Sequence, residues 1–404
     1  MTSKVIHVMG LDVGSSRVCA VIADVNAHGK VAVRGIGTSI TSGIQSGWIV
    51  DEGELSKSVD RAISRAVAQA GIKPLHVLTN IPSAGVRFLH SAGFVVAKEE
   101  SGQITAEDRA SAIQLSKNIV KDIQERIMHV IPISYKVEGR PIEYPIGAYG
   151  RNLEVGVSVI LGNQATIRVL TQILNRLGFQ VNGLMADVIA SSQVMLSLHE
   201  QRRGVILIDI GGRFTKIAVI QNQSLIKGAI IPLGGETVTS DISQCLNVTL
   251  PEAERLKLIY SDVNIGRVSP LESIEVTTKD KGRKRIKAQL LSQIVEARIS
   301  EIFDLIYKKN LIDDANDFPI VLGGGGGQLN GLPQYIETRF ARKVRVGLPD
   351  DMSRILENPN YASAYGAILQ GIQTQAIPYN KLPKENVVIK WLNTATAIFN
   401  KSKV

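Results

Sequence analysis

The sequence has little cysteine, few aromatic residues and no long apolar run. Its two cysteines, Cys19 and Cys245, lie in unrelated contexts, which argues against a disulfide framework and favours a reducing compartment. No stretch offers the roughly 18 consecutive apolar residues of a membrane-spanning helix. The first residues, Met-Thr-Ser-Lys, lack the basic and apolar regions of a signal peptide. We therefore expect a protein of the cytoplasm without a transmembrane helix.

The formal net charge of +9 favours an anionic partner, such as nucleic acid, an acidic protein or a lipid surface. Aromatic residues, on which bases stack, make up only 5% of the chain, and its basic residues are spread out. We therefore expect no nucleic-acid partner. With 404 residues, of which 44% are hydrophobic, the chain is long enough for roughly two to four domains with buried cores.

Two segments about 197 residues apart share one pattern, in which a strand ends in Asp and a glycine turn leads into a second strand. Glycine allows close backbone approach, and turn N–H groups with small hydroxyls cradle phosphate. Each Asp can hold Mg²⁺ through water. One copy alone would favour an ordinary β-turn, but the internal duplication favours two hairpins that clamp a phosphate tail. The pattern residues are Asp12, Gly14, Ser15, Ser16 and Arg17 in the first copy and Asp209, Gly211, Gly212 and Thr215 in the second.

A run of five glycines, Gly323 to Gly327, follows the apolar segment FPIVL. It leaves no side chains between the backbone and a flat ligand. A flexible linker is the alternative, but a strand pattern precedes the run and the helix-like LPQYIETRF follows it. Together with the two hairpins, the run predicts a nucleotide site.

Several other elements can be predicted from spacing and caps. Apolar spacing predicts a helix over 53–71 with Gly71 as its C-cap, and a helix from Thr166 to Leu177. Thr105 and Asp108 form a capping box for a helix that we expect to run to about Arg126. Residues 236–300 are charged and read as more irregular, and the basic run 279–287 within them is most simply a solvated hairpin loop.

In order along the chain, these motifs resemble those of the actin, heat-shock-chaperone and sugar-kinase superfamily. Segments 11–24 and 205–221 resemble its two phosphate hairpins, 321–335 its adenosine motif, and 181–196 and 361–371 its two connecting helices. The resemblance implies an α/β fold of two duplicated ribonuclease-H-like domains with a nucleotide cleft between them. It also implies ATP and Mg²⁺ as cofactors.

Within this superfamily the chain resembles the FtsA family of bacterial cell-division proteins. Residues 85–163 replace a subdomain of actin with a separate α+β insert, and IMHVIPISYKVEG and PIGAYGRNLEV within it are similar to FtsA. The resemblance implies a protein that polymerises and anchors FtsZ filaments to the cytoplasmic face of the inner membrane at the septum. It also implies that later division proteins are recruited, and that the C-terminal peptide of FtsZ binds the subdomain containing 279–287.

The implied domain organisation has six parts. They are domain 1 (1–84, 164–200 and 361–375), the insert (85–163), domain 2 (201–235 and 301–360), its smaller subdomain (236–300), a linker (376–385) and an amphipathic membrane-targeting helix (386–404).

The second hairpin departs from the family pattern, which usually reads Asp-Ile-Gly-Gly-Gly-Thr-Thr-Asp. Arg213 takes the third glycine position, Phe214 a threonine position and Lys216 the final acidic position. The Arg213 guanidinium either pairs with phosphates or fills part of the pocket. In the first hairpin, Arg17 replaces the usual lysine, which is a milder change. We expect ATP binding, and at most a weak ATPase.

The resemblance assigns further residues to the site. A residue that orients water would be Gln193, or less directly Asp187, although both also suit an ordinary polar helix face. Glu254 and Lys257, spaced i and i+3, match a helix beside the adenosine, with a solvated surface pair as the alternative. The remaining implied nucleotide contacts are Gly234, Gly235, Gly324, Gly325, Gly326 and Gln328.

The C-terminal segment has apolar residues at intervals of three and four, which places them on one helical face next to lysines. This pattern is typical of a helix that lies in an anionic membrane surface, and the Pro-containing linker before it makes docking onto the core the less favoured alternative. The apolar residues are Val388, Trp391, Leu392, Ala395, Ile398 and Phe399.

Two alternative functions remain. A small-molecule kinase of the same fold would need a catalytic carboxylate and a substrate cleft, and would not be expected to have the 85–163 insert or the tail. A pilus-assembly actin homologue would share the fold and the insert but should lack the tail.

Overall fold

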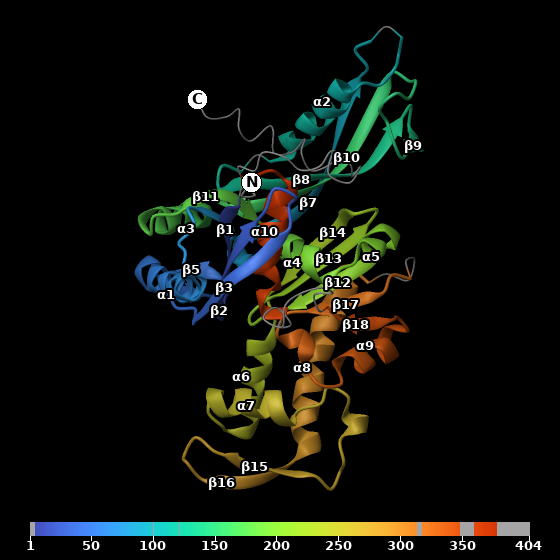
Figure 1. The fold of residues 1–404 in the computed structure, drawn as a ribbon. Coiled ribbons are helices and arrows are strands. Elements are labelled where there is room, and N and C mark those ends of the chain that lie inside the picture. Colours follow the sequence, from blue (N-terminus) through green and yellow to red (C-terminus); the bar gives the residue numbers. More distant parts are fainter. Residues whose placement is uncertain (1–4, 100, 121, 313–316, 348–358, 378–404) are drawn as a thin grey trace. The chain divides into compact units, whose positions relative to one another are not determined.

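The computed structural model describes residues 5–99, 101–120, 122–312, 317–347 and 359–377 (Figure 1). The chain divides into two compact units, the first formed by 1–193, 223–227 and 363–404 and the second by 194–222 and 228–362. The predicted tail helix, with its apolar residues from Val388 to Phe399, lies outside the described residues. The finer six-part division stays a prediction.

The first unit is built on a five-stranded sheet in the order β11-β6-β1-β2-β3. β1 runs antiparallel to β2 and parallel to β6, which in turn runs parallel to β11. The three parallel strands therefore end at the same edge of the sheet. The strands are β1 (Ile6–Val13), β2 (Arg17–Val25), β3 (Val31–Ile40), β6 (His76–Asn80) and β11 (Gln180–Met185).

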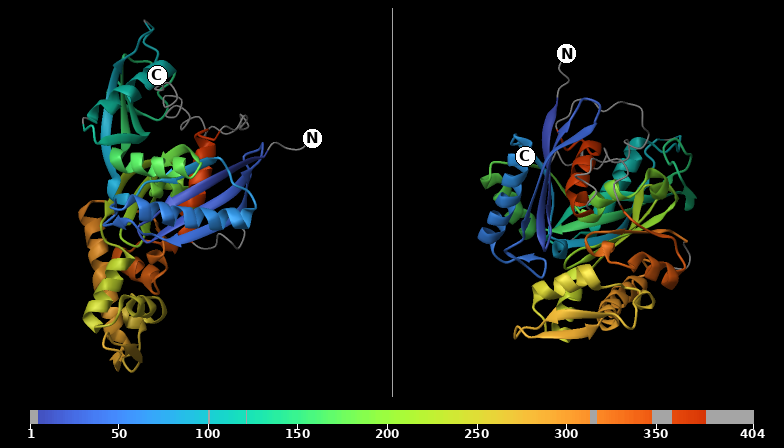
Figure 2. Two further views of the ribbon diagram at one scale, coloured as in Figure 1. Left: turned by 90° about the vertical axis from the view of Figure 1, so that its left-hand side faces the viewer. Right: turned by 60° about the horizontal axis from the view of Figure 1, so that its bottom comes forward.

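Helices cover this sheet. α1 (Glu52–Ala70) lies along β3 (Figure 2) and has the predicted end, because Gly71 takes the left-handed conformation. Near α10 (Ala362–Gln373), a Cβ on Gly10 of β1 would collide with the carbonyl of Ala364, so only glycine allows this close approach. The other elements are β4 (Ile44–Gln45), β5 (Trp48–Ile49), α3 (Gln164–Arg176) and α4 (Asp187–Met195).

The insert is a four-stranded antiparallel sheet with one helix, α2 (Ala106–Ser116), against it. The capping box of Thr105 and Asp108 is confirmed. The predicted extension of this helix to Arg126 is wrong, because the Ser116 carbonyl accepts a hydrogen bond from Ser91 Oγ and a short 3₁₀ turn follows. The strands, in sheet order, are β7 (Val86–Val96), β10 (Asn152–Asn163), β8 (Glu125–Val137) and β9 (Arg140–Ile142).

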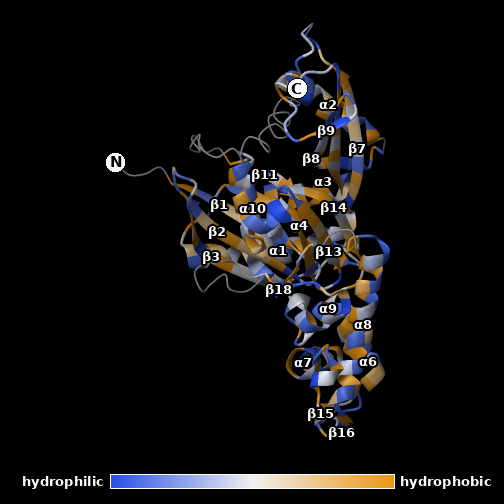
Figure 3. Cartoon of the chain, turned by 90° about the vertical axis from the view of Figure 1, so that its right-hand side faces the viewer, coloured by the Kyte–Doolittle hydropathy of each residue, from blue (hydrophilic) through white to orange (hydrophobic). Residues whose placement is uncertain are grey.

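The second unit contains another five-stranded sheet, whose central strands carry mostly apolar residues (Figure 3). β12 pairs antiparallel with β13 and parallel with β17. This arrangement repeats that of β2, β1 and β6, as the internal duplication predicts. In sheet order the strands are β14 (Ser224–Ile231), β13 (Thr215–Gln221), β12 (Val205–Ile210), β17 (Ile320–Gly323) and β18 (Val344–Val346).

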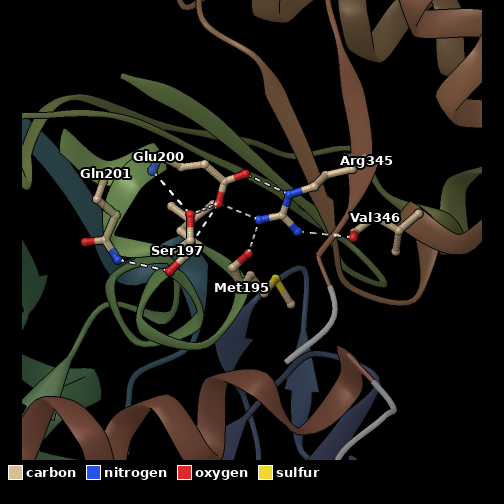
Figure 4. Close-up of polar contacts among 7 residues, drawn as sticks. Met195, Ser197, Glu200, Gln201, Arg345 and Val346 are labelled. Atoms are coloured by element: carbon tan, nitrogen blue, oxygen red, sulfur yellow. Dashed lines mark hydrogen bonds and ion pairs between the residues drawn. The ribbon is translucent and has the colours of Figure 1, made fainter. Parts of the chain in front are cut away.

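A partly exposed ion pair holds β18 to α5 (Leu198–Arg203) (Figure 4). Arg345 donates from Nε and Nη2 to the two carboxylate oxygens of Glu200, at 2.7 and 2.6 Å, and Nη2 also donates to the Met195 carbonyl. Burial alone would raise the pKa of Glu200, but the hydrogen bonds from Arg345 and Ser197 hold that pKa below its usual range. The fork-to-fork pairing fixes the position of the outer strand.

Residues 236–300 are regularly folded, so the expectation of an irregular stretch is wrong. Apolar residues such as Val238, Ile242 and Leu246 recur at helical spacing and are buried, which the many charges between them conceal in the sequence. The basic run 279–287 belongs to a β-hairpin, as predicted, but forms its second strand as well as its turn. The elements are α6 (Gly235–Leu246), α7 (Leu250–Tyr260), β15 (Ser273–Thr277), β16 (Arg283–Lys287), α8 (Ala288–Lys308) and, after β17, α9 (Leu332–Phe340).

Segment 181–196 is a strand followed by a helix rather than one helix. Its first half forms β11, because it pairs with β6, and α4 begins at Asp187. Among the described residues, no helix combines the length and apolar character that crossing a bilayer requires.

Candidate functional site

The first hairpin closes as a tight turn between β1 and β2. The Gly14 N–H donates to the Arg17 carbonyl at 3.0 Å, and Thr41 Oγ1 donates to the Gly14 carbonyl at 2.8 Å. A Cβ on Gly14 would lie only 2.8 Å from the Arg17 carbonyl oxygen. Ser15 and Ser16 therefore stand at the tip of the turn, and their contact with phosphate stays a prediction.

Asn80 joins two of the predicted site residues. Its Nδ2 donates to Asp12 Oδ1 at 2.5 Å and to Asp187 Oδ1, while its Oδ1 accepts from the Val13 N–H at 2.7 Å. Ser83 Oγ donates to the other oxygen of Asp187 at 3.4 Å. Asp12, Asn80 and Asp187 lie at or just beyond the carboxyl ends of the neighbouring strands β1, β6 and β11, where α/β sheets bind ligands.

Asn80 is not among the residues predicted from the sequence, although a signal was present. Asn80 is a polar residue near the end of the strand-like segment HVLTNIP, as Asp12 is near the end of its own strand. The missing information was the parallel pairing of β6 with β1, which brings the two strand ends together.

The two candidates for the water-orienting residue lie in different surroundings. Asp187 begins α4, whereas Gln193 lies six residues later, about 9 Å along the helix axis. Gln193 Oε1 accepts a hydrogen bond at 2.9 Å from Gln373 Nε2 of α10. Asp187 therefore belongs to the Asn80 cluster, and Gln193 to a contact between helices.

In the second unit, the second hairpin places Asp209 directly opposite Lys216 across β12 and β13. Lys216 Nζ lies 3.3 Å from Asp209 Oδ2, and the two side chains are only 13% and 5% exposed. The turn closes with the Gly211 N–H donating to the Phe214 carbonyl at 2.9 Å. The residue that replaces the usual acidic group is thus paired with the aspartate predicted to hold metal.

The glycine run folds over the end of β12. Gly324 has a positive φ of 71°, and a Cβ there would collide with Asp209 Oδ1 and the Ile210 carbonyl. A Cβ on Gly326 would collide with the Ile210 side chain, whereas Gly325 is exposed. At least two of these glycines are therefore required by packing against the second hairpin.

Gly234 and Gly235 fix the start of α6 on the same hairpin. The Gly235 and Glu236 N–H groups donate to the Gly211 and Gly212 carbonyls at 2.9 and 2.7 Å. Glu236 also holds the Arg213 guanidinium, with Nε 3.0 Å from Oε2. This pairing is a third outcome for Arg213, besides binding phosphate or filling the pocket.

Lys257 is buried and ties α7 to α6. Its Nζ donates to the Gly235 carbonyl at 3.0 Å, to Thr239 Oγ1 at 2.9 Å and to Glu254 Oε2 at 2.7 Å. An ammonium group has three protons to donate, and these bonds use all three. Lys257 and Glu254 therefore support the helix next to Gly235, and direct contact with a nucleotide stays a prediction.

A cavity of about 520 Å³ lies in the second unit between the end of α7 and the loop that follows the glycine run. Of the predicted contacts, it is lined by Gln328, together with Tyr260, Asp262 and Arg267. Its volume is within the range of small-molecule sites.

Comparison with solved structures defines the class of protein. A chain of the PilM-PilN type IV pilus biogenesis complex superposes with a TM-score of 0.66, at 17% identity, covering 90% of this chain and 98% of that chain. MreB 5 of Spiroplasma citri bound to AMPPNP superposes with a TM-score of 0.54, at 13% identity, covering 90% and 95%. The chain therefore has the actin-like fold, as predicted.

Comparison of sequences then defines the family. The family models described as "Cell division protein FtsA" and "SHS2 domain inserted in FTSA" match residues 206–366 and 84–161. Cell division protein FtsA of Borreliella burgdorferi is 32% identical, covering 96% of this chain and 95% of the relative. The Pseudomonas aeruginosa and Escherichia coli K12 proteins of the same name are 28% and 27% identical over about nine-tenths of each chain. The chain belongs to the FtsA family of cell division proteins.

Proposed function

We propose that this chain binds ATP, polymerises and anchors FtsZ filaments to the cytoplasmic face of the bacterial inner membrane at the septum, where it recruits later division proteins. The observation that carries this proposal is the match to FtsA proteins over nearly the whole chain, insert included. That match favours a division protein over a small-molecule kinase or a pilus-assembly homologue.

ATP binding is supported by the build of the first hairpin and by the fold. MreB 5, which shares the fold, has been solved with AMPPNP and with ADP. Asp12 is partly exposed and is oriented by Asn80, so it suits Mg²⁺ held through water. Such a metal would neutralise charge on the phosphates, while Ser15 and Ser16 would supply donors at the turn.

Calorimetric titration with ATP and Mg²⁺ tests this part of the proposal. Asp12→Ala is expected to weaken binding about tenfold, because it removes the acceptor that holds Asn80 against the base of the first hairpin as well as the carboxylate that would face the metal. Asp24→Ala is the matched control, since Asp24 lies at the far end of the same strand pair and contacts His7 at 2.7 Å. Equal ATP affinity of Asp12→Ala and the wild type would contradict the pocket.

Membrane anchoring is assigned to the tail, which lies outside the described residues. In sedimentation with anionic vesicles, the full chain is expected to bind, whereas a chain that ends at Gln375 is expected to stay in solution. Trp391→Glu places a charge on the predicted apolar face and should weaken vesicle binding. Asn393→Glu adds the same charge elsewhere on the predicted helix and is the matched control. Vesicle binding that persists in the chain ending at Gln375 would reject the anchor. Polymerisation would strengthen attachment because many tails act together.

The FtsZ peptide is assigned to the subdomain that carries the β15–β16 hairpin. Arg283, Lys284 and Arg285 of this hairpin are exposed and suit an acidic peptide. Anisotropy with a labelled FtsZ C-terminal peptide is expected to give weaker binding after charge reversal at Lys284 and Arg285. The same reversal at Lys308 and Lys309, beyond the hairpin, is the control, and an equal loss in both variants would reject this location.

Hydrolysis depends on the second hairpin. The Arg213 side chain stands where the family has glycine and is held by Glu236. Phosphate release by Arg213→Gly is expected to exceed that of the wild type if this side chain suppresses hydrolysis. An unaltered rate would remove that role.

A further inference from the structure

The second hairpin carries a lysine where a metal was predicted. The Asp209 carboxylate is 5% exposed, its Oδ2 faces the Lys216 ammonium, and its Oδ1 packs against Gly324. Mg²⁺ dehydrates reluctantly and usually keeps several of its waters. A carboxylate enclosed on both sides by protein offers no room for a hydrated ion, so Asp209 does not fit the predicted role of metal ligand.

The lysine also lies beside the turn where phosphate is expected. Its Nζ and Cε are each 3.8 Å from the position that a Cβ on Gly211 would take. This is the glycine whose backbone would approach the ligand. Lysine is a common phosphate binder that acts as a point charge, so its ammonium supplies at this position what a metal ion would supply.

The rest of the hairpin is arranged to hold that charge in place. The register of β12 and β13 sets Lys216 opposite Asp209, and Gly324 closes over the carboxylate that orients it. The other cation of the hairpin, Arg213, is drawn to Glu236. A lysine side chain that is only 13% exposed loses little further freedom when a ligand binds, which favours binding.

We infer that Lys216 is the resident cation of the second hairpin and that it makes nucleotide binding by this chain largely independent of divalent metal. The inference rests on the proposed binding of ATP and concerns which cation holds the phosphates at the second hairpin. Phosphates would be held at this hairpin by an ammonium group fixed on Asp209, with Mg²⁺ contributing only through Asp12.

The test compares ATP affinity in Mg²⁺ with affinity in EDTA, using the full chain and calorimetric titration. For the wild type, affinity in EDTA is expected to stay within about threefold of that in Mg²⁺. Lys216→Asp restores the acidic residue of the family pattern, and its affinity in EDTA is expected to fall about tenfold or more and to recover with Mg²⁺.

Two further variants guard against misfolding. Asp209→Asn combined with Lys216→Met removes both charges, so no unpaired charge is left buried. It is expected to lose about tenfold in affinity in EDTA, and Mg²⁺ is not expected to restore the wild-type value. Lys216→Arg keeps the positive charge and is expected to keep binding ATP in EDTA. Circular dichroism and thermal unfolding check that each variant folds.

The outcomes separate the inference from the proposed function. Wild-type binding of ATP in Mg²⁺ that disappears in EDTA would overturn the inference and leave ATP binding intact. The same holds if the double variant matches the wild type in both conditions, since the ion pair would then be structural only. Absence of ATP binding in both conditions would overturn the proposed binding and, with it, the inference.

Discussion

Replacing Asn80 by aspartate is the sharpest test of the cluster at the edge of the first sheet. The Asn80 side chain accepts from the Val13 N–H and donates to the carboxylates of Asp12 and Asp187. Only one orientation of the amide satisfies all three contacts, because carboxylates cannot donate and the N–H cannot accept. Aspartate has the same shape and can still accept from the Val13 N–H. It would, however, place a third carboxylate next to those of Asp12 and Asp187, where the amide of Asn80 donates hydrogen bonds.

The expected loss of stability depends on pH. The new carboxyl group can remain between two carboxylates by binding a proton, whereas an aspartate in the unfolded chain has a pKa of about 3.9. Its folded-state pKa is therefore raised, and the folded state binds one proton more than the unfolded state in the window between the two pKa values. Stability then falls as pH rises, by about 1.4 kcal/mol per pH unit. From pH 5 upwards the deficit of Asn80→Asp relative to the wild type should grow until the pH passes the folded-state pKa of the new carboxyl group, and by at most about 4 kcal/mol at pH 8.

Urea unfolding at several pH values between 5 and 8 measures this deficit. Asn163→Asp is the matched control, because Asn163 caps α3 by accepting from the Thr166 N–H, and aspartate is an equally good N-cap. The control should follow the wild type across this range. Parallel stability profiles for Asn80→Asp and the wild type would refute the proposed arrangement of the three carboxyl-bearing positions.

Three other predictions follow from the described contacts. Burial lowers the pKa of His129 to about 4. The unfolded state therefore binds a proton more readily, and the protein loses stability as pH falls from 6.5 towards 4. Acid unfolding of His129→Leu should show a loss of stability smaller by about 3 kcal/mol than that of the wild type. Gly324→Ala should lower the melting temperature, because the new Cβ meets Asp209, whereas Gly325→Ala should change the melting temperature little. Thr105→Ala should cost about 1 kcal/mol in urea unfolding by removing the N-cap of α2, and an unchanged midpoint would argue against that cap.

Local signals in the sequence were sufficient for much of the fold. The capping box at Thr105 and the glycine end at Gly71 are properties of a few adjacent residues, and both are confirmed. The duplicated hairpins could be recognised because each lies within one short segment of the chain, 11–24 or 205–221. The end of α2 could not be predicted in this way, since the hydroxyl that takes the Ser116 carbonyl belongs to Ser91 on a distant strand.

The same distinction applies to the candidate site. Asp12 and Asp187 were found one at a time, but the residue that joins them, Asn80, depends on the parallel order of three strands. Lys216 was recognised only as a departure from the family pattern. A four-residue turn after Ile210 places Lys216 opposite Asp209, so the pairing of these two residues could have been predicted from the strand register.

The two unusual cations of the second hairpin have one physical consequence in common. Arg213 pairs with Glu236 and Lys216 with Asp209, so each cation is balanced by a carboxylate from its own unit. Removing one member of the buried pair leaves an unpaired charge, which costs more than removing both. Because Glu236 also donates its N–H to the Gly212 carbonyl, the hairpin and the start of α6 form one hydrogen-bonded body. A phosphate that drew Arg213 away from Glu236 would therefore act directly on α6, which would connect this hairpin to the predicted smaller subdomain, 236–300, without requiring hydrolysis.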